Sequence, residues 1–358
     1  MRTFIKTTLA TALLAGLFGS GGVQAQEQKT LYLFNWSQYM DPDIITQFEE
    51  KYDAKVVENF FNSNSEMFAK LRAGGDSQYD VIVPSNYFVP RLVATGLVQK
   101  LDHSKIPNIK NLRPKFKDPS FDPGNQYSVA YQWGTTGVIY NKKTLGEQPE
   151  SWSVLFDPSV NGDYPFALLG GDGQPTIGAA CAYLGFGYRC SDHDQWKKAA
   201  KLVLDTKRRS NFNGFVDGTP MLQQISRGVI HAGVTYNGDY VFYKSEDPEA
   251  YKNIEFMIPK EGAELWVDNM LIPDKAPHPD LAHKFINFIL DAKIGAQLSN
   301  WTYYSSPNEA SLPMLDEVLQ HPPSTPTDEE MARVHFSLDL SGNDLKFFQQ
   351  LWTEVQSR

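Results

Sequence analysis

The order of strand and helix signals in the N-terminal part of the chain constrains the fold most. An apolar run at 31–36 has strand composition, and Asp41-Pro42 then supplies an N-cap and a proline suited to the first helical turn. Further strand and helix signals alternate after it, at 55–57, 66–73, 79–83 and 89–96. This βαβα order predicts an α/β fold with a mostly parallel sheet and helices on both faces.

Three later segments carry expectations of their own. Residues 127–141 form a long β-rich run that Gly134-Thr135-Thr136-Gly137 interrupts, and such a flexible break is a suitable place for the chain to cross between two lobes. Residues 279–301 are predicted as one long helix, and a final helix is expected around 345–355.

The first 25 residues have the pattern of a secretory signal peptide. Arg2 and Lys6 are its positive region, residues 9–18 its apolar region, and the small residue Ala25 predicts cleavage after that position. No other run is long and apolar enough to span a bilayer, so we expect a periplasmic protein. Because the segment has two basic residues and no acid, cleavage moves the formal net charge from -9 to -11. That balance argues against nucleic acid and suits a cationic ligand, although many solvated surfaces are simply acidic.

Known catalytic and metal-binding motifs are missing from the sequence. There is no G-x-S-x-G and no HExxH, and we expect no enzyme activity, cofactor or metal. We interpret Asp192-His193-Asp194 as the capped start of a helix rather than a metal site. The glycine-rich turn at 170–176 is either a tight turn with a helix cap or an anion site at a helix N-terminus. Cys181 and Cys190 are the only cysteines, and in an oxidising compartment they can form a disulfide.

Aromatic residues recur beside acids or small polar residues at the predicted strand ends. In open α/β sheets, ligands bind just beyond the carboxyl ends of the strands. Each set by itself is explained by packing, and the loop after the first strand is equally well a surface loop. Together the sets suit an organic cation, because aromatic faces attract methylene and ammonium groups and carboxylates neutralise their charge. The candidates are Trp36, Ser37, Tyr39, Ser85, Tyr87, Tyr236, Asp239, Trp266, Asp268 and Tyr304.

Five segments resemble the bacterial spermidine/putrescine-binding periplasmic proteins. They are Leu-Tyr-Leu-Phe-Asn-Trp-Ser-Gln-Tyr at 31–39, Tyr-Asp-Val-Ile-Val-Pro-Ser at 79–85, Gln-Trp-Gly-Thr-Thr at 132–136, Trp-Val-Asp at 266–268 and Tyr-Ser-Ser-Pro-Asn at 304–308. The resemblance covers nearly the whole mature chain and implies a two-lobed, hinged periplasmic-binding fold of type II. It implies lobe 1 at 26–134 plus roughly 270–302, and lobe 2 at 135–269 plus roughly 303–358.

The resemblance also implies a role for each candidate. Asp268 is the acid that anchors an amine, with Trp266 stacked beside the ligand chain. The first lobe contributes aromatic walls and hydrogen bonds from Trp36, Ser37, Tyr39, Ser85 and Tyr87. The second lobe contributes Asp239 and Tyr236, and Tyr304 closes one side. Pro175 stands near where the family usually has a glutamate, which leaves Asp172 as the nearest carboxylate.

Three departures from the family pattern affect the expected ligand. Gln38 replaces an acid, Pro175 stands near the usual glutamate, and Tyr236 replaces a tryptophan. The two lost carboxylates weaken the usual placement of amines and leave room for another polyamine, such as norspermidine, or for a different amine.

The sequence leaves open two kinds of membrane partner and a further class of ligand. The expected membrane partner of the monomeric protein is an ABC permease that imports the polyamine. The alternative partner is a membrane-bound receptor that controls cyclic-di-GMP and biofilm formation, and both would recognise the ligand-closed state. A second alternative is the same fold with an anionic or neutral metabolite as its ligand.

Overall fold

Ten strands and fifteen α-helices make up the described part of the chain. The computed structural model describes residues 29–358, so the predicted signal peptide and its cleavage site after Ala25 lie outside the described residues. The strands are β1 Lys29–Trp36, β2 Ala54–Phe61, β3 Val81–Ile82, β4 Ser128–Asn141, β5 Phe166–Leu168, β6 Phe212–Phe215, β7 Ala232–Tyr236, β8 Ile254–Met257, β9 Ala263–Leu271 and β10 Val334–Phe336. The helices are α1 Pro42–Tyr52, α2 Asn64–Arg72, α3 Val89–Ala94, α4 Lys142–Leu145, α5 Ser153–Phe156, α6 Pro158–Asn161, α7 Gln174–Tyr183, α8 His193–Lys207, α9 Thr219–Ser226, α10 Asn237–Glu246, α11 Pro248–Tyr251, α12 Pro279–Ile289, α13 Ala292–Thr302, α14 Asp328–Ala332 and α15 Gly342–Ser357.

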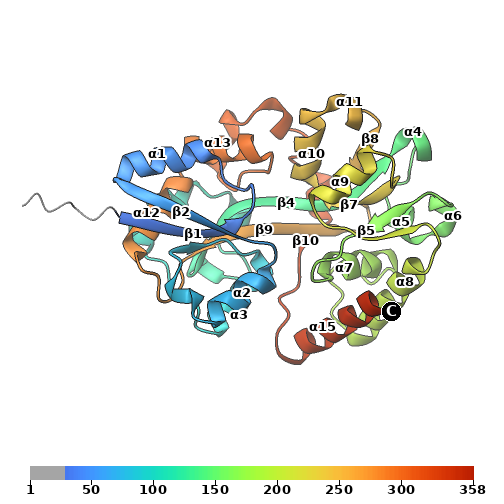
Figure 1. Cartoon of the computed structure of the whole chain (residues 1–358), viewed down its shortest axis with the longest axis horizontal. Coiled ribbons are helices and arrows are strands. Elements are labelled where there is room, and N and C mark those ends of the chain that lie inside the picture. Colours follow the sequence, from blue (N-terminus) through green and yellow to red (C-terminus); the bar gives the residue numbers. More distant parts are fainter. Residues whose placement is uncertain (1–28) are drawn as a thin grey trace, which may run out of the picture.

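The molecule has two halves that share one sheet (Figure 1). Its strand order is β2-β1-β3-β9-β4-β7-β5-β6, with β10 beside β9 and β8 beside β4. The outer strands pair in parallel, whereas β4 and β9 are antiparallel to each other and run through the middle between the two halves. Helices α1, α2, α3, α12 and α13 surround one half, and α4 to α11 with α15 surround the other. The α/β architecture predicted from the sequence is therefore present.

The predicted break at 134–137 is wrong, because β4 is one continuous strand of 14 residues. It pairs with β9 as far as Thr135 and with β7 from Thr136 onward. The glycines serve close packing instead of flexibility: a Cβ at Gly137 would lie 2.4 Å from Phe256 Cζ. The lobe boundary at 134/135 stays a prediction, and this change of strand partner supports it.

The single long helix predicted at 279–301 is also wrong. The chain forms two helices, α12 and α13, because the Asp291 side chain accepts hydrogen bonds from the backbone N–H groups of Lys293 and Ile294 and so starts a new helix. The carbonyl of Leu290 accepts a 2.8 Å hydrogen bond from Asn308 Nδ2, which satisfies the end of α12.

The C-terminal segment contacts both halves of the molecule. The 3-10 helix η7, Glu309–Met314, packs against α13, where Ser311 Oγ donates to the Ala292 carbonyl at 2.8 Å. Helix α15 packs against α8, with the rings of Phe347 and His193 stacked 4.0 Å apart. The assignment of roughly 303–358 to lobe 2 stays a prediction, and the position of η7 favours the first lobe for that part.

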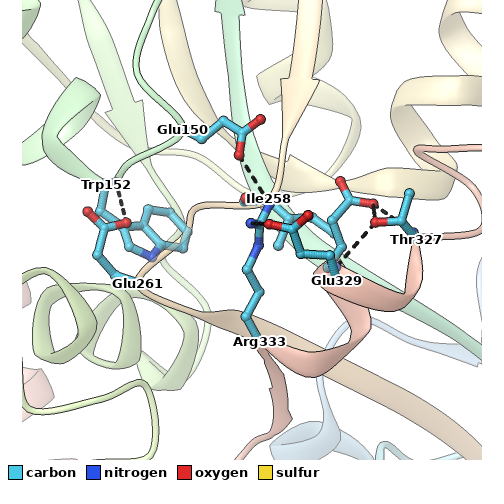
Figure 2. Close-up of polar contacts among 8 residues, drawn as sticks. Glu150, Trp152, Ile258, Glu261, Thr327, Glu329 and Arg333 are labelled. Atoms are coloured by element: carbon cyan, nitrogen blue, oxygen red, sulfur yellow. Dashed lines mark hydrogen bonds and ion pairs between the residues drawn. The ribbon is translucent and has the colours of Figure 1, made fainter.

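Arg333 fixes the segment that enters β10 to the second half (Figure 2). Its Nη2 donates to the Ile258 carbonyl at 2.9 Å and pairs with Glu150 at 3.3 Å. Its Nη1 lies 3.8 Å from Glu329 of α14. Strand β10 pairs with β9 at Ala263–Leu265. The contacts of Arg333 therefore also hold β10 in place beside β9.

Two local predictions are confirmed. Cys181 of α7 and Cys190 of the loop before α8 form a disulfide. Asp192 caps α8 by accepting hydrogen bonds from the backbone of Asp194 and Gln195.

Within residues 29–358, no group of histidine, cysteine and acidic residues is arranged to hold a metal ion. Among the same residues, no helix has the length and hydropathy needed to cross a membrane.

Candidate ligand-binding site

The floor of the candidate site is the antiparallel pair of β4 and β9 at the centre of the molecule (Figure 1). Trp266 and Asp268 lie two residues apart on β9, so their side chains share one face of the strand. Gly134 and Gln132 of β4 lie opposite them in register. A Cβ at Gly134 would lie 2.5 Å from Trp266 Cζ2, so only glycine lets the indole rest against β4. An indole and a carboxylate are thus held side by side on rigid strands.

Asp268 is a buried carboxylate, 6% exposed, that is held by the first half of the molecule. Ser85, directly after β3, donates to Asp268 Oδ1 at 2.6 Å. Asn64 fixes Ser85 by donating to its Oγ at 3.1 Å and accepting from its backbone N–H at 3.0 Å. Burial raises the pKa of Asp268 to about 7, against which the hydrogen bonds from Ser85 and Tyr39 act.

A second carboxylate, Asp239, lies in the first turn of α10. The hydroxyl of Tyr304 donates to Asp239 Oδ1 at 2.5 Å. Gly238 makes this contact possible, because a Cβ there would lie 2.3 Å from Tyr304 Cδ1. Burial raises the pKa of Asp239 to about 6, and the Tyr304 hydrogen bond acts in the opposite direction.

Four aromatic rings meet edge to face between these carboxylates. Trp266 contacts Tyr304 at 5.0 Å and Tyr236 at 5.9 Å between ring centroids, and Tyr304 contacts Tyr39 at 5.7 Å. The Trp266 Nε1 is buried without a hydrogen-bond partner in residues 29–358. Buried polar atoms of this kind are normally satisfied, so they indicate where a ligand contacts the protein.

Trp36 and Ser37, at the end of β1, stay predicted site residues, and their contacts are with the first half of the molecule and with solvent. The Trp36 indole donates to the Val83 carbonyl at 2.9 Å and packs on Phe61 at 4.4 Å, so it belongs to the wall of the first half. Ser37 is exposed at the end of β1, and Gln38 beside it has a left-handed backbone with φ of 55°.

Tyr87 and Asp172 approach each other from opposite halves of the molecule. Asn64 Nδ2 donates to the Tyr87 hydroxyl at 3.1 Å. Burial is the main cause that raises the pKa of Tyr87, and the nearby charge of Asp172 raises it further. Burial likewise raises the pKa of Asp172. The two side chains therefore lie close to each other where the two halves meet.

The glycine-rich turn at 170–176 is a capped turn, and carboxylates of the protein itself accept hydrogen bonds from several of its backbone N–H groups. Asp217 accepts hydrogen bonds from the backbone of Gly170 at 2.9 Å and Gly171 at 3.0 Å. Trp352 of α15 covers the turn, since a Cβ at Gly173 would lie 2.3 Å from its ring. This finding argues against an anionic ligand at the N-terminus of α7.

Sequence analysis missed two polar residues of the site. Asn64 lies in the first turn of α2, directly after the N-cap Ser63, and its side chain holds both Ser85 and Tyr87. Glu264 is a buried carboxylate on β9, two residues before Trp266. The alternation of 264, 266 and 268 on one strand is the signal that could have identified it.

In the part of the chain that the structure describes, no ion pair neutralises the carboxylates of the site, and the one cation that acts on them is Arg91, whose charge lowers the pKa of Asp172. None of the ion pairs in residues 29–358 includes Asp172, Asp239, Glu264 or Asp268. Burying carboxylates near one another without a counter-charge is costly, and a bound cation would remove much of that cost.

Two α/β lobes joined by strands that carry a buried acidic and aromatic site define a type II periplasmic binding protein. Solved structures agree with this class. A putative spermidine/putrescine ABC transporter from Listeria monocytogenes superimposes with a TM-score of 0.83 at 32% identity, covering 92% of this chain and 99% of that chain.

The chain belongs to the bacterial extracellular solute-binding protein family, whose model matches residues 43–327. The putrescine/cadaverine-binding protein of Pseudomonas aeruginosa is 34% identical over 354 residues, covering 97% of this chain and 99% of that relative. The spermidine/putrescine-binding periplasmic protein of Escherichia coli is 30% identical over 321 residues, covering 88% and 87% respectively. The family resemblance predicted from the sequence is confirmed.

Proposed function

We propose that the protein binds a linear polyamine between its lobes in the periplasm and presents it to a membrane ABC importer, without catalysis. The relatives described above are named as binding proteins for spermidine, putrescine or cadaverine, and this supports the proposed ligand class. The resemblance also supports the importer as the partner. No residue observed here favours the signalling receptor over the importer.

The observation that carries the proposal is the set of carboxylates that form no ion pair in the described residues. Asp268 is held from the first lobe by Ser85, and Asp239 is held by Tyr304. The Trp266 indole lies next to Tyr304, with its Nε1 unpaired in the described residues. Ammonium groups at the carboxylates and methylenes on the aromatic rings would satisfy both features.

Calorimetric titration of the purified protein with putrescine, spermidine, norspermidine and spermine tests the proposal. Inorganic phosphate and an amino-acid mixture are the matched controls. We expect one polyamine to bind with a Kd of about micromolar or tighter. Heat from a control ligand with none from any polyamine would refute the proposed ligand class.

A further inference from the structure

Glu264 is a buried carboxylate that the family resemblance does not assign to the ligand. It is 3% exposed and lies on β9. Its Oε2 accepts a 2.8 Å hydrogen bond from Thr136 Oγ1, and its Oε1 accepts one from Ser337 Oγ. Both donors are neutral, and no ion pair among the described residues includes this carboxylate. Neutral hydrogen bonds only partly offset the cost of burying a carboxylate charge.

The position of Glu264 extends the floor of the site. Side chains alternate along a strand, so Glu264, Trp266 and Asp268 share one face of β9. Thr135 of β4 pairs with Leu265 of β9. The next residue of β4, Thr136, donates its hydrogen bond to Glu264 from this neighbouring strand. At about 3.3 Å per residue, the two acids are roughly 13 Å apart along the strand, with the indole between them.

An unpaired polar atom lies at the Glu264 end of this line. Tyr188 is 6% exposed, and its hydroxyl has no hydrogen-bond partner in residues 29–358. Its ring rests on Gly178 of α7, where a Cβ would lie 2.8 Å from Tyr188 Cζ. A Cβ at Gly262, the residue before β9, would lie 3.5 Å from Tyr188 Cβ, so Tyr188 packs beside the Glu264 end of the strand. Burial raises the pKa of Tyr188, and the charge of Glu264 is the next cause.

Glu264 is also within electrostatic range of aromatic side chains from both lobes. Its charge contributes to the raised pKa of Tyr87 from the first lobe and of Tyr236 from the second.

We propose that Glu264 is a second amine-binding carboxylate and that the floor of the site holds a polyamine along the line Glu264–Trp266–Asp268. One ammonium group pairs with Asp268 and another with Glu264, while the methylene chain lies on the indole. This inference rests on the proposed function and deepens it, because it supplies a carboxylate from β9 in a chain that has Pro175 near the usual glutamate.

The arrangement predicts selectivity by chain length. A triamine such as spermidine or norspermidine is long enough to engage both acids. Putrescine, a short diamine, is anchored by the Asp268 end alone. Loss of the Glu264 charge should therefore weaken triamines more than putrescine.

The test is calorimetric titration of wild-type protein and Glu264→Gln with spermidine, norspermidine and putrescine. Glutamine keeps the shape and accepts at least one of the two hydrogen bonds. We expect triamine affinity to fall at least about tenfold, because a hydrogen bond to a charged group contributes more than an ordinary one, and putrescine affinity to change by less than about threefold.

Two further variants separate ligand binding from structural support. Thr136→Val removes a hydrogen bond to Glu264 and keeps the charge, so triamine affinity should change less than in Glu264→Gln. Glu264→Asp keeps the charge but retracts it by one methylene, and we expect a smaller loss of triamine affinity. This second variant also tests the inference if Glu264→Gln does not fold.

Three outcomes overturn the inference. Unchanged triamine affinity in folded Glu264→Gln refutes it while leaving the proposed function in place. Equal losses for triamines and putrescine would show general damage to the site instead of a second anchor. Absence of polyamine binding by the wild-type protein would refute the proposed function and this inference together.

Discussion

In the proposed site, the carboxylates that form no ion pair in the described residues are the side chains on which binding should depend. The pKa of Asp268 and that of Glu264 are raised to about 7, and the pKa of Asp239 to about 6, with burial as the first cause in each. A charged ligand changes this balance, since an ammonium group close to a carboxylate favours its ionised form. Affinity at this site should therefore come mainly from charge pairing, with the aromatic rings adding smaller contributions.

Replacing Asp268 with asparagine should lower polyamine affinity at least about tenfold, because the anchoring charge is lost while the shape of the side chain is kept. Calorimetric titration measures the effect. Glu246→Gln is the matched control, since Glu246 is exposed at the far end of α10 and its loss changes net charge equally. An affinity of Asp268→Asn equal to that of the control would remove Asp268 from the site.

At the scale of single elements, glycines on β4 and α10 create the surfaces on which the aromatic rings lie. Gly134 accepts the Trp266 indole, and Gly238 accepts the Tyr304 ring. Neither glycine has a left-handed backbone, so close approach explains them and turn geometry does not. The strand and the helix thus fix the orientation of the aromatic groups without any flexible loop.

Gly238→Ala should weaken polyamine binding about tenfold or more, although alanine is normally the better helix residue. The new Cβ would lie 2.3 Å from Tyr304 Cδ1 and displace the ring that donates to Asp239. Calorimetry measures the affinity, and circular dichroism checks the fold. Tyr304→Phe, which removes only the hydroxyl, is the control and should lose less. Wild-type affinity in Gly238→Ala would show that the ring position does not matter.

The disulfide between α7 and the loop before α8 should stabilise the protein without contributing to binding. The two cysteines are nine positions apart, and closing so short a loop contributes about 2–3 kcal/mol through the entropy of the unfolded chain. We expect the Cys181→Ala/Cys190→Ala double variant to lose about this free energy of unfolding in urea titration and to bind polyamine normally. A large drop in affinity would contradict the separation of the two roles.

At the scale of the whole molecule, the site exists only where the two halves meet. Ser85 and Asn64 come from the first half, Asp239 and Tyr236 from the second, and β4 and β9 run between them. A ligand that contacts both halves favours the closed arrangement over any open one by its differential affinity for the two. Closure of the two halves on a ligand would suit an importer and a receptor equally, since either partner would recognise the closed surface.

The pH dependence of stability should differ between free and polyamine-bound protein. Carboxyls with raised pKa values keep protons in the folded state that the unfolded chain has already released, in a window from about pH 4 to 7. The free energy of unfolding of the free protein should therefore fall as pH rises through that window. A cationic ligand favours the ionised carboxyls, so its binding releases protons and strengthens as pH rises.

Thermal unfolding with and without spermidine at about pH 5 and about pH 8 measures this effect, and the ligand-induced rise in Tm should be larger at the higher pH. Asp268→Asn is the control for other titrating groups and should show a smaller difference between the two pH values. Equal rises in Tm at both pH values in the wild-type protein would contradict the linkage.

The sequence by itself determined the family, the order of most strands and helices, the disulfide, and the candidate residues at the strand ends. These features follow from local signals: side-chain period, caps such as Asp41 and Asp192, and short motifs. Only the tertiary structure decided that β4 is unbroken and that 279–302 forms two helices. It also decided that Trp352 and Asp217 close the glycine-rich turn, and that Glu264 is buried on the same strand as Trp266 and Asp268. Ser85 and Asp268, which form a 2.6 Å hydrogen bond, are 183 positions apart in the chain. Contacts at such separation depend on strand register and on packing between lobes, and no local pattern in the sequence encodes them.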